Sequence, residues 1–122
     1  MFKNVASQKV AVFAWDNAAG SAKTGDSGNI TAQISKDGAA TAATDDTNPT
    51  ELDSTDAPGI YIFDMLQAET NADLVVISPV SSTSDIVLRP VIIYTADDAA
   101  TAATLTNVLA KLNLITVLVE ER

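Results

Sequence analysis

Carboxylates are the only side chains in this sequence that could act as general acids and bases at neutral pH. The chain contains no His and no Cys, which removes the usual general base, thiolate nucleophiles and the common zinc ligands. Acidic residues do occur in pairs, at 45–46, 53 with 56, 97–98 and 120–121. Glycoside hydrolysis needs two carboxylates across a sugar-binding cleft, and the few aromatic residues lie mostly in apolar, strand-like runs. We therefore predict that the chain is not an enzyme.

Metal and phosphate sites are also weakly supported. Acidic residues crowd segment 45–56, but the segment lacks the glycine-bearing loop that presents several oxygen ligands to calcium. Gly20, Gly25 and Gly28 are not followed by the Gly-Lys-Ser/Thr of a phosphate-binding loop. We expect solvated loops here, with no metal and no cofactor. The glycine-rich loop could become ordered on contact with a neighbouring protein.

The charge balance limits the partners. Seven basic and 16 acidic residues give a formal net charge of −9, and the basic residues are scattered. Because nucleic-acid binding depends on clustered Lys and Arg, we expect no nucleic-acid partner. No apolar window reaches the length of a membrane span and no signal peptide is evident, so we expect a soluble chain with no membrane contact.

The chain patterning predicts short strands separated by turns. Strands are expected in five apolar or alternating runs, residues 10–15, 29–35, 59–65, 73–80 and 86–94. A further short strand is expected at 50–52. A turn at 36–38 and a helical turn at 66–70 lie between them. Pro79 and Pro90 each remove a backbone donor, which favours edge positions or bulges. This organisation favours an antiparallel sandwich over a sheet with helical crossovers.

The strand that follows Pro58 carries the most specific short motif. Tyr61 stands two residues before Phe63, as in the tyrosine corner of immunoglobulin-like sandwiches, where the hydroxyl bonds back to upstream backbone. We predict that Phe63 fills the core, with Trp15 of the first strand as its partner. The motif bears on the fold and not on a ligand.

The C-terminal segment, residues 96–122, has a different pattern. Asp97 and Asp98 precede an Ala- and Thr-rich stretch, which is typical of a capped helix start. An apolar stripe with coiled-coil spacing follows, formed by Leu105, Val108, Leu112, Ile115 and Val119. Two alternatives remain open: an amphipathic helix packed on the sandwich, or a helix to about residue 113 followed by a strand over 114–119.

A set of short segments, taken in order, resembles the small immunoglobulin-like domains of virion structural proteins of tailed bacteriophages. The segments are 7–10, 23–26, 30–32, 35–38, 58–61, 67–71 and 90–95. The resemblance covers roughly residues 4–95. It implies a mainly β chain with an immunoglobulin-like antiparallel β-sandwich at 1–95, and a short C-terminal helix or strand extension at 96–122 for oligomerisation or anchoring.

The same resemblance implies a function through contact. Such domains serve as head decoration or cement proteins or as fibre and baseplate attachment modules, they are commonly trimeric, and they carry no catalytic residues. We therefore expect a virion protein, a homotrimer that binds the major capsid protein or another virion protein, and a capsid decoration or cement role. A tail-fibre or baseplate adaptor and a carbohydrate-binding surface module are the alternatives.

Overall fold

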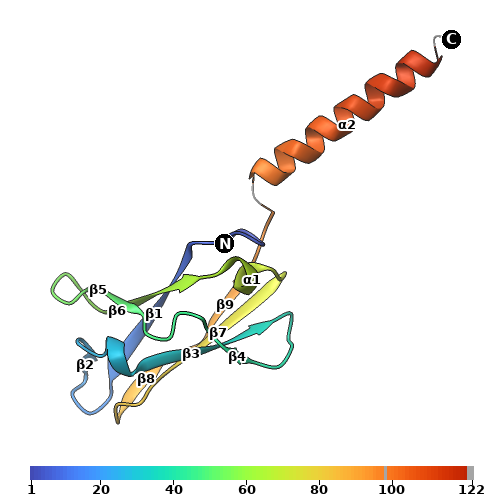
Figure 1. Cartoon of the computed structure of the whole chain (residues 1–122). Coiled ribbons are helices and arrows are strands. Elements are labelled where there is room, and N and C mark those ends of the chain that lie inside the picture. The colour runs from blue at the N-terminus through green and yellow to red at the C-terminus, as the bar shows by residue number, and fades with distance from the viewer. Residues whose placement is uncertain (98, 121–122) are drawn as a thin grey trace.

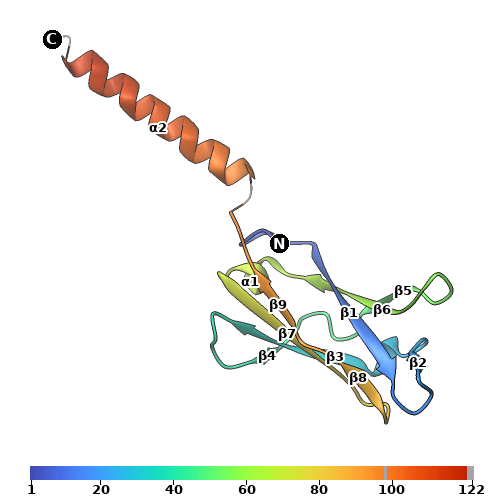
Figure 2. The ribbon, with the colours of Figure 1, turned by 180° about the vertical axis from the view of Figure 1, so that it is seen from behind.

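The chain folds into two packed antiparallel sheets followed by one long helix. The computed structural model describes residues 1–97 and 99–120, with side chains described for 1–97 and 104–120. Figures 1 and 2 show the sheets as two layers and the long helix α2, Ala99–Glu120, standing away from both. We refer to the part formed by strands β1–β9 as the β module. The mainly β, antiparallel part of the predicted fold is confirmed.

The first sheet is built around two long neighbouring strands, β1 (Gln8–Asp16) and β6 (Ala57–Met65), which pair over six residues of β1. Strand β5, Thr50–Asp53, extends the sheet beyond β6. The end of β1 pairs with β2 (Ser21–Ala22) and also with β8 (Ile86–Leu88). Because both pair with Trp15, they must lie on opposite edges of β1.

The second sheet has the order β4-β3-β7-β9. Its longest ladder joins β3 (Ile30–Lys36) to β7 (Leu74–Ser81) over seven residue pairs. Strands β4, Ala42–Ala43, and β9, Val91–Tyr94, form its two edges. A short helix α1, Gln67–Thr70, connects β6 to β7, and a 3-10 turn, Ser27–Asn29, precedes β3.

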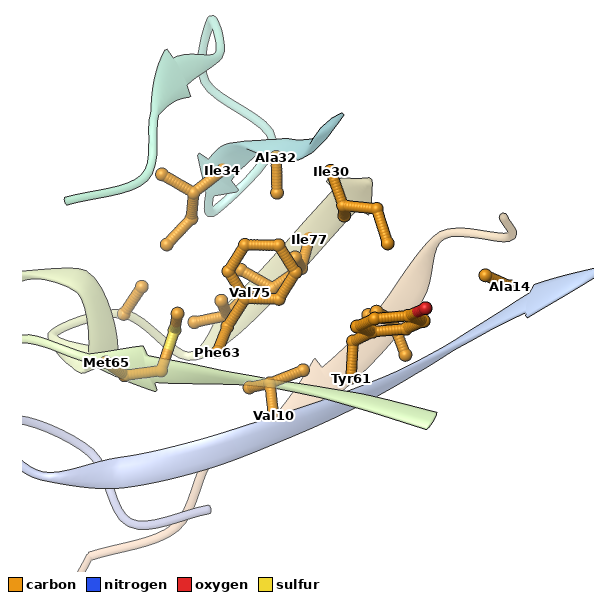
Figure 3. Close-up of a cluster of buried hydrophobic side chains, with 12 residues drawn as sticks. Val10, Ala14, Ile30, Ala32, Ile34, Tyr61, Phe63, Met65, Val75 and Ile77 are labelled. Atoms are coloured by element: carbon orange, nitrogen blue, oxygen red, sulfur yellow. The ribbon is translucent and has the colours of Figure 1, made fainter. Parts of the chain in front are cut away.

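Alternate side chains of the four longest strands fill the space between the sheets (Figure 3). The buried apolar residues are Val10, Val12, Ala14, Ile30, Ala32, Ile34, Tyr61, Phe63, Met65, Ala72, Val75 and Ile77. Phe63 is fully buried, as predicted. Burial of a Leu-sized or aromatic side chain contributes roughly 1.5–3 kcal/mol, so this thin, mostly aliphatic layer is the main stabilising element of the β module.

Trp15 does not belong to this core, and that prediction is wrong. Strand β1 turns Val10, Val12 and Ala14 inward, so the alternation of side chains places Trp15 on the outer face, 39% exposed. The residue opposite Phe63 on β1 is Val10. The indole of Trp15 instead lies beside the ring of Phe13.

Glycine is required at position 59, inside β6. Its φ is +83°, a left-handed value that side chains disfavour. A Cβ there would lie 2.9 Å from Ala14 O, Ala22 Cβ and Phe13 Cε2. Residue 59 therefore lets β6 approach β1 and β2 more closely than any side chain would permit.

Proline positions follow the predicted rule. Pro79 pairs with Ala32 on one side, in the part of β7 that lies beyond its ladder with β9. Pro90 stands between β8 and β9, where the predicted single strand 86–94 divides. Strand β8 joins the first sheet and β9 the second, so the break at Arg89 and Pro90 moves the chain from one layer to the other.

The C-terminal segment is one continuous helix from Ala99 to Glu120. The alternative with a strand over 114–119 is therefore wrong. The packed-helix alternative is also wrong, because every described side chain from 104 to 120 is exposed. Of the predicted cap pair, Asp98 lies outside the described residues.

Candidate functional site

Helix α2 presents an uncovered apolar surface, formed by the five predicted stripe residues. Leu105, Val108, Leu112, Ile115 and Val119 are between 48% and 66% exposed. Residues three and four apart lie on the same side of a helix, so the five form one line along its axis. Because the β module does not cover this line, it is available to another helix.

Apolar side chains on α2 extend beyond the predicted stripe. Leu109, Leu114, Val117 and Leu118 are also exposed, and the helix contains only two charged residues, Lys111 and Glu120. A helix that is apolar on most sides is normally buried against other elements. Among the described residues, no helix is long and apolar enough to cross a membrane.

The residue types along the stripe carry information on the number of helices that would pack together. In a heptad register, Leu105, Leu112 and Val119 occupy a, whereas the d positions hold the β-branched Val108 and Ile115. Leu at a with a β-branched residue at d favours three or four helices over two. Leu109 at e and Leu118 at g widen the apolar seam, which also favours more than two helices.

The outer face of the first sheet is a second exposed apolar surface. Phe13 and Trp15 of β1 have their ring centroids 6.3 Å apart, and Val87 of β8 stands opposite Trp15. Ile60 and Ile62 of β6 lie on the same face beside Phe13 and Ala11, and both are half-buried. By contrast, strand β3 of the second sheet turns polar residues outward, namely Thr31, Gln33 and Ser35. We call the surface around Phe13, Trp15 and Val87 the aromatic face.

Tyr61 holds the loop before β3 and does not form a local tyrosine corner. Its hydroxyl donates to Lys23 O at 2.8 Å and accepts from the Asp26 N–H at 3.1 Å. These partners lie more than 30 residues upstream, and Tyr61 stands in the middle of β6. Burial, followed by the nearby charges of Glu51 and Asp26, raises the pKa of the Tyr61 phenol, although the Asp26 N–H opposes this.

Asp26 is a buried carboxylate that sequence reasoning missed. Ser81 Oγ donates to one oxygen at 2.6 Å; Thr83 Oγ1 (2.6 Å) and Asn29 Nδ2 (3.0 Å) donate to the other. Burial alone would raise the pKa of Asp26, but these hydrogen bonds and the charge of Lys23 outweigh it and hold the pKa below its usual value. In the sequence, Asp26 lies between Gly25 and Gly28 and resembles an ordinary loop residue. Its partners Ser81 and Thr83 are more than 50 residues away and meet it only in the folded chain.

Several acidic side chains near segment 45–56 serve as structural hydrogen-bond acceptors. Asp46 accepts the Asp64 N–H, and Glu69 accepts the N–H groups of Asp45 and Leu66. The part of the chain that the structure describes contains no group of three or more acidic side chains placed to hold a metal ion. These contacts fasten the long connection 39–58 to β6 and α1.

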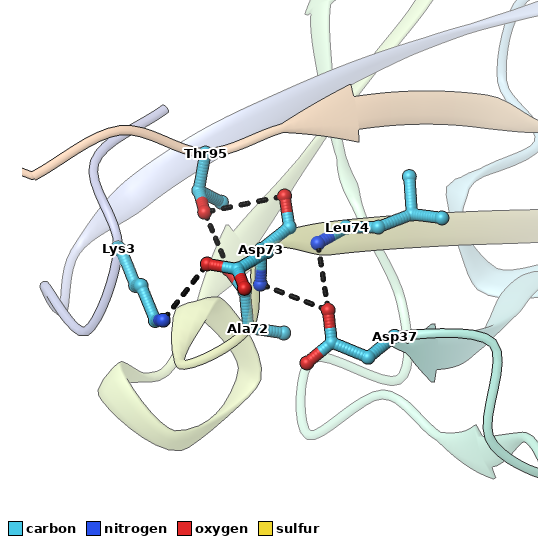
Figure 4. Close-up of polar contacts among 6 residues, drawn as sticks. All are labelled: Lys3, Asp37, Ala72, Asp73, Leu74 and Thr95. Carbon is cyan, nitrogen blue, oxygen red and sulfur yellow. Dashed lines mark hydrogen bonds and ion pairs between the residues drawn. The ribbon is translucent and has the colours of Figure 1, made fainter.

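A polar network secures the end of the β module from which α2 departs (Figure 4). The Asp37 carboxylate accepts from the backbone N–H groups of Asp73 and Leu74, both at 3.0 Å. Lys3 binds Asp73 at 2.8 Å, which raises the pKa of the lysine. Thr95 Oγ1 donates to Ala72 O. The N-terminal arm, β7 and the chain after β9 are thus held together directly below the helix.

The structure does not bring the predicted residues into one site. Tyr61 and Phe63 lie in the core, Trp15 lies on the aromatic face, and the stripe lies on α2. Two separate contact surfaces result, one on the helix and one on the first sheet. No family model, curated protein sequence or solved structure matches the chain.

Proposed function

We propose that this chain is a bacteriophage virion structural protein, a capsid decoration or cement subunit that acts through protein–protein contacts and assembles as a homotrimer. The single observation that carries the proposal is the row of exposed apolar side chains along α2. A chain that leaves nine large aliphatic side chains uncovered on one helix would aggregate unless other copies or partners covered them.

The pairing pattern supports the immunoglobulin-like part of the proposal. In that fold the strands B, E and D form one sheet and C, F and G the other. The orders β1-β6-β5 and β3-β7-β9 are similar to this arrangement and support the proposal, with β4 added beside β3. Strand β1 takes the place of strand B, and the described N-terminal arm before it forms only an isolated parallel bridge, between Phe2 and Ala96.

The distribution of charge supports association through the helix. Lys111 and Glu120 balance within α2, so the acidic excess of the chain lies outside it. Copies of the β module therefore repel one another, whereas copies of the helix do not. Three helices packed along their stripes would carry three β modules spread apart, each free to contact a capsid surface.

The test is the position of the protein on intact particles. Antibody labelling and quantitative mass spectrometry of purified particles should find it on the head in a multiple of three copies. Labelling on the tail would favour the adaptor alternative, and absence from washed particles would contradict a virion role.

The aromatic face supports a second candidate function, carbohydrate binding. Sugar rings stack on exposed aromatic side chains, and Phe13 and Trp15 provide such a pair, with ring planes 38° apart. A glycan array probed with the wild type and with Trp15→Ala tests it. Glycan signals that vanish in the variant would support the module, and an array with no signals would contradict it.

A further inference from the structure

One edge of β1 is left without a partner strand. Over Gln8 to Phe13, β1 pairs with β6 alone. In an antiparallel ladder, the backbone groups of alternate residues point to opposite edges. Ala14 O accepts from Lys23 N–H on the β2 edge, whereas Asn17 N–H donates to Asp85 O on the β8 edge. Gly59 of β6 packs against Ala14 O and Ala22 of β2, so β6 lies on the β2 edge. The odd-numbered residues Lys9, Ala11 and Phe13 therefore direct their N–H and C=O groups away from β6.

The edge is open because the last strand changes sheets. Strand β8 pairs with β1 only from Ala14 to Asp16. After Arg89 and Pro90 the chain pairs with β7 instead, and Pro90 has no N–H to continue the first ladder. The result is a groove between β1 and β9, which we call the β1–β9 groove.

The groove has two adjoining sections and an apolar floor. One section, about 600 Å³, lies between Trp15 and Arg89, and the next, about 470 Å³, reaches Met1 and Ile93. Ala11 and Val91 line both sections. Met1, Val91 and Ile93 are only partly buried against the core, so they close the side of the core where a strand would otherwise lie.

The charge of the groove is opposite to that of the chain. Its lining includes Lys9 and Arg89 and no carboxylate, although the chain has 16 acidic residues. Lys9 pairs with the exposed Asp64. Within the described part of the chain, Arg89 makes no ion pair or side-chain hydrogen bond, so its guanidinium is free to bind a carboxylate.

We propose that the β1–β9 groove binds an extended segment of another protein, which adds a strand to the free edge of β1. Backbone groups of the segment bond to Lys9, Ala11 and Phe13, as in other cases of strand addition. Alternate apolar side chains lie on the floor, and an acidic side chain pairs with Arg89. This proposal does not depend on a role in a virion.

A second copy of this chain is a poorer occupant. Edge-to-edge pairing of two β1 strands would bring two acidic β modules together, and their like charges would repel one another. A partner segment with acidic residues has no such cost.

The test selects displayed random peptides of about 12 residues, long enough for one strand, on the full-length chain. Ala11→Pro is the counter-selected variant, because it removes a free N–H from the open edge and leaves the ladder with β6 intact. We expect enriched peptides with apolar residues at alternate positions and an acidic residue near one end. They should bind the wild type at least about tenfold more tightly than Ala11→Pro.

Two further measurements keep the test decisive if Ala11→Pro folds poorly. Arg89→Glu should weaken the same peptides at least about tenfold, whereas the same charge change at Lys36 on the second sheet should change binding less than about twofold. Hydrogen exchange at the amides of Lys9, Ala11 and Phe13 should slow when the peptide binds.

Peptides that bind the wild type and both groove variants equally would overturn the proposal, as would a selection that enriches none. Protection of the three amides that rises with the concentration of the chain alone would assign the edge to a second copy. That result would also overturn it, whatever the position of the protein on a particle.

Discussion

At the residue scale, a few polar side chains join segments that the apolar core does not connect. Asp26 links the loop before β3 to Ser81 and Thr83, and Tyr61 holds the same loop from β6. Each contact is buried or partly buried. Because a buried polar group without its partner costs free energy, these residues fix one conformation of a glycine-rich loop.

The first prediction concerns Asp26. Since its pKa is lower in the folded chain, its contribution to stability is present above the ordinary Asp pKa and is lost as the pH falls below it. Asp26→Asn should lower the free energy of unfolding by about 2 kcal/mol at neutral pH. Urea unfolding between about pH 7 and pH 2.5 should show the two proteins converging below about pH 4. A difference that does not change with pH would contradict this role.

The second prediction compares two glycines with similar backbone angles. Gly59 and Gly38 have φ values of +83° and +75°, but only Gly59 has atoms within reach of an added Cβ. Gly38→Ala should cost about 1 kcal/mol, from the backbone alone. Gly59→Ala adds overlap with Ala14 O and should cost at least about 2 kcal/mol more. Equal melting temperatures for the two variants would show that β6 and β1 can move apart freely.

At the element scale, most strands followed from alternation, and the errors have identifiable causes. The predicted runs became β1, β3, β6 and β7 because one face of each is apolar and packs on the other sheet. The two-residue strands β2 and β4 were missed because pairing with a neighbour defines them, not their own pattern. The prediction for Trp15 is wrong because the inward alternation of Val10, Val12 and Ala14 places residue 15 on the outer face. The sequence does not decide between helix and strand near the end of α2, because the β-branched residues there suit a strand as well.

Self-association of α2 is the third prediction, and it can be tested by a matched pair of substitutions. Leu112 lies in the centre of the stripe, whereas Asn113 lies off it and is also exposed. Leu112→Glu places a charge in the seam and should weaken association at least about 100-fold. An isolated helix of this length is marginal, so its circular dichroism signal should also fall. Asn113→Glu should change neither property; equal effects of both would contradict a seam along the stripe.

At the scale of the whole molecule, the chain combines a rigid acidic part with a neutral apolar helix. The β module carries the acidic excess, and Figure 1 shows α2 extending from the end at which Lys3, Asp37 and Asp73 tie the termini of the module together. This arrangement would separate the two kinds of contact. Under the proposed function, copies of the chain would meet through the helix, and other proteins would meet the β module.

Ionic strength gives the fourth prediction. Because the β modules repel one another and the seam is apolar, raising the salt concentration from about 0.05 M to about 0.5 M should strengthen self-association by screening the repulsion. Dissociation constants from sedimentation at the two salt concentrations measure the effect. Weaker association at high salt would mean that ion pairs between β modules hold the copies together.

The proposed function requires α2 to assemble three copies of this chain. Sedimentation equilibrium of the 122-residue chain, from about 1 to 100 μM, tests this assembly. The range covers dissociation constants in the micromolar region, where a trimer would form without a capsid. If three helices pack along their stripes, we expect a single species with three times the mass of the chain over most of this range. A monomer at every concentration, or a dimer that goes no further, would contradict it.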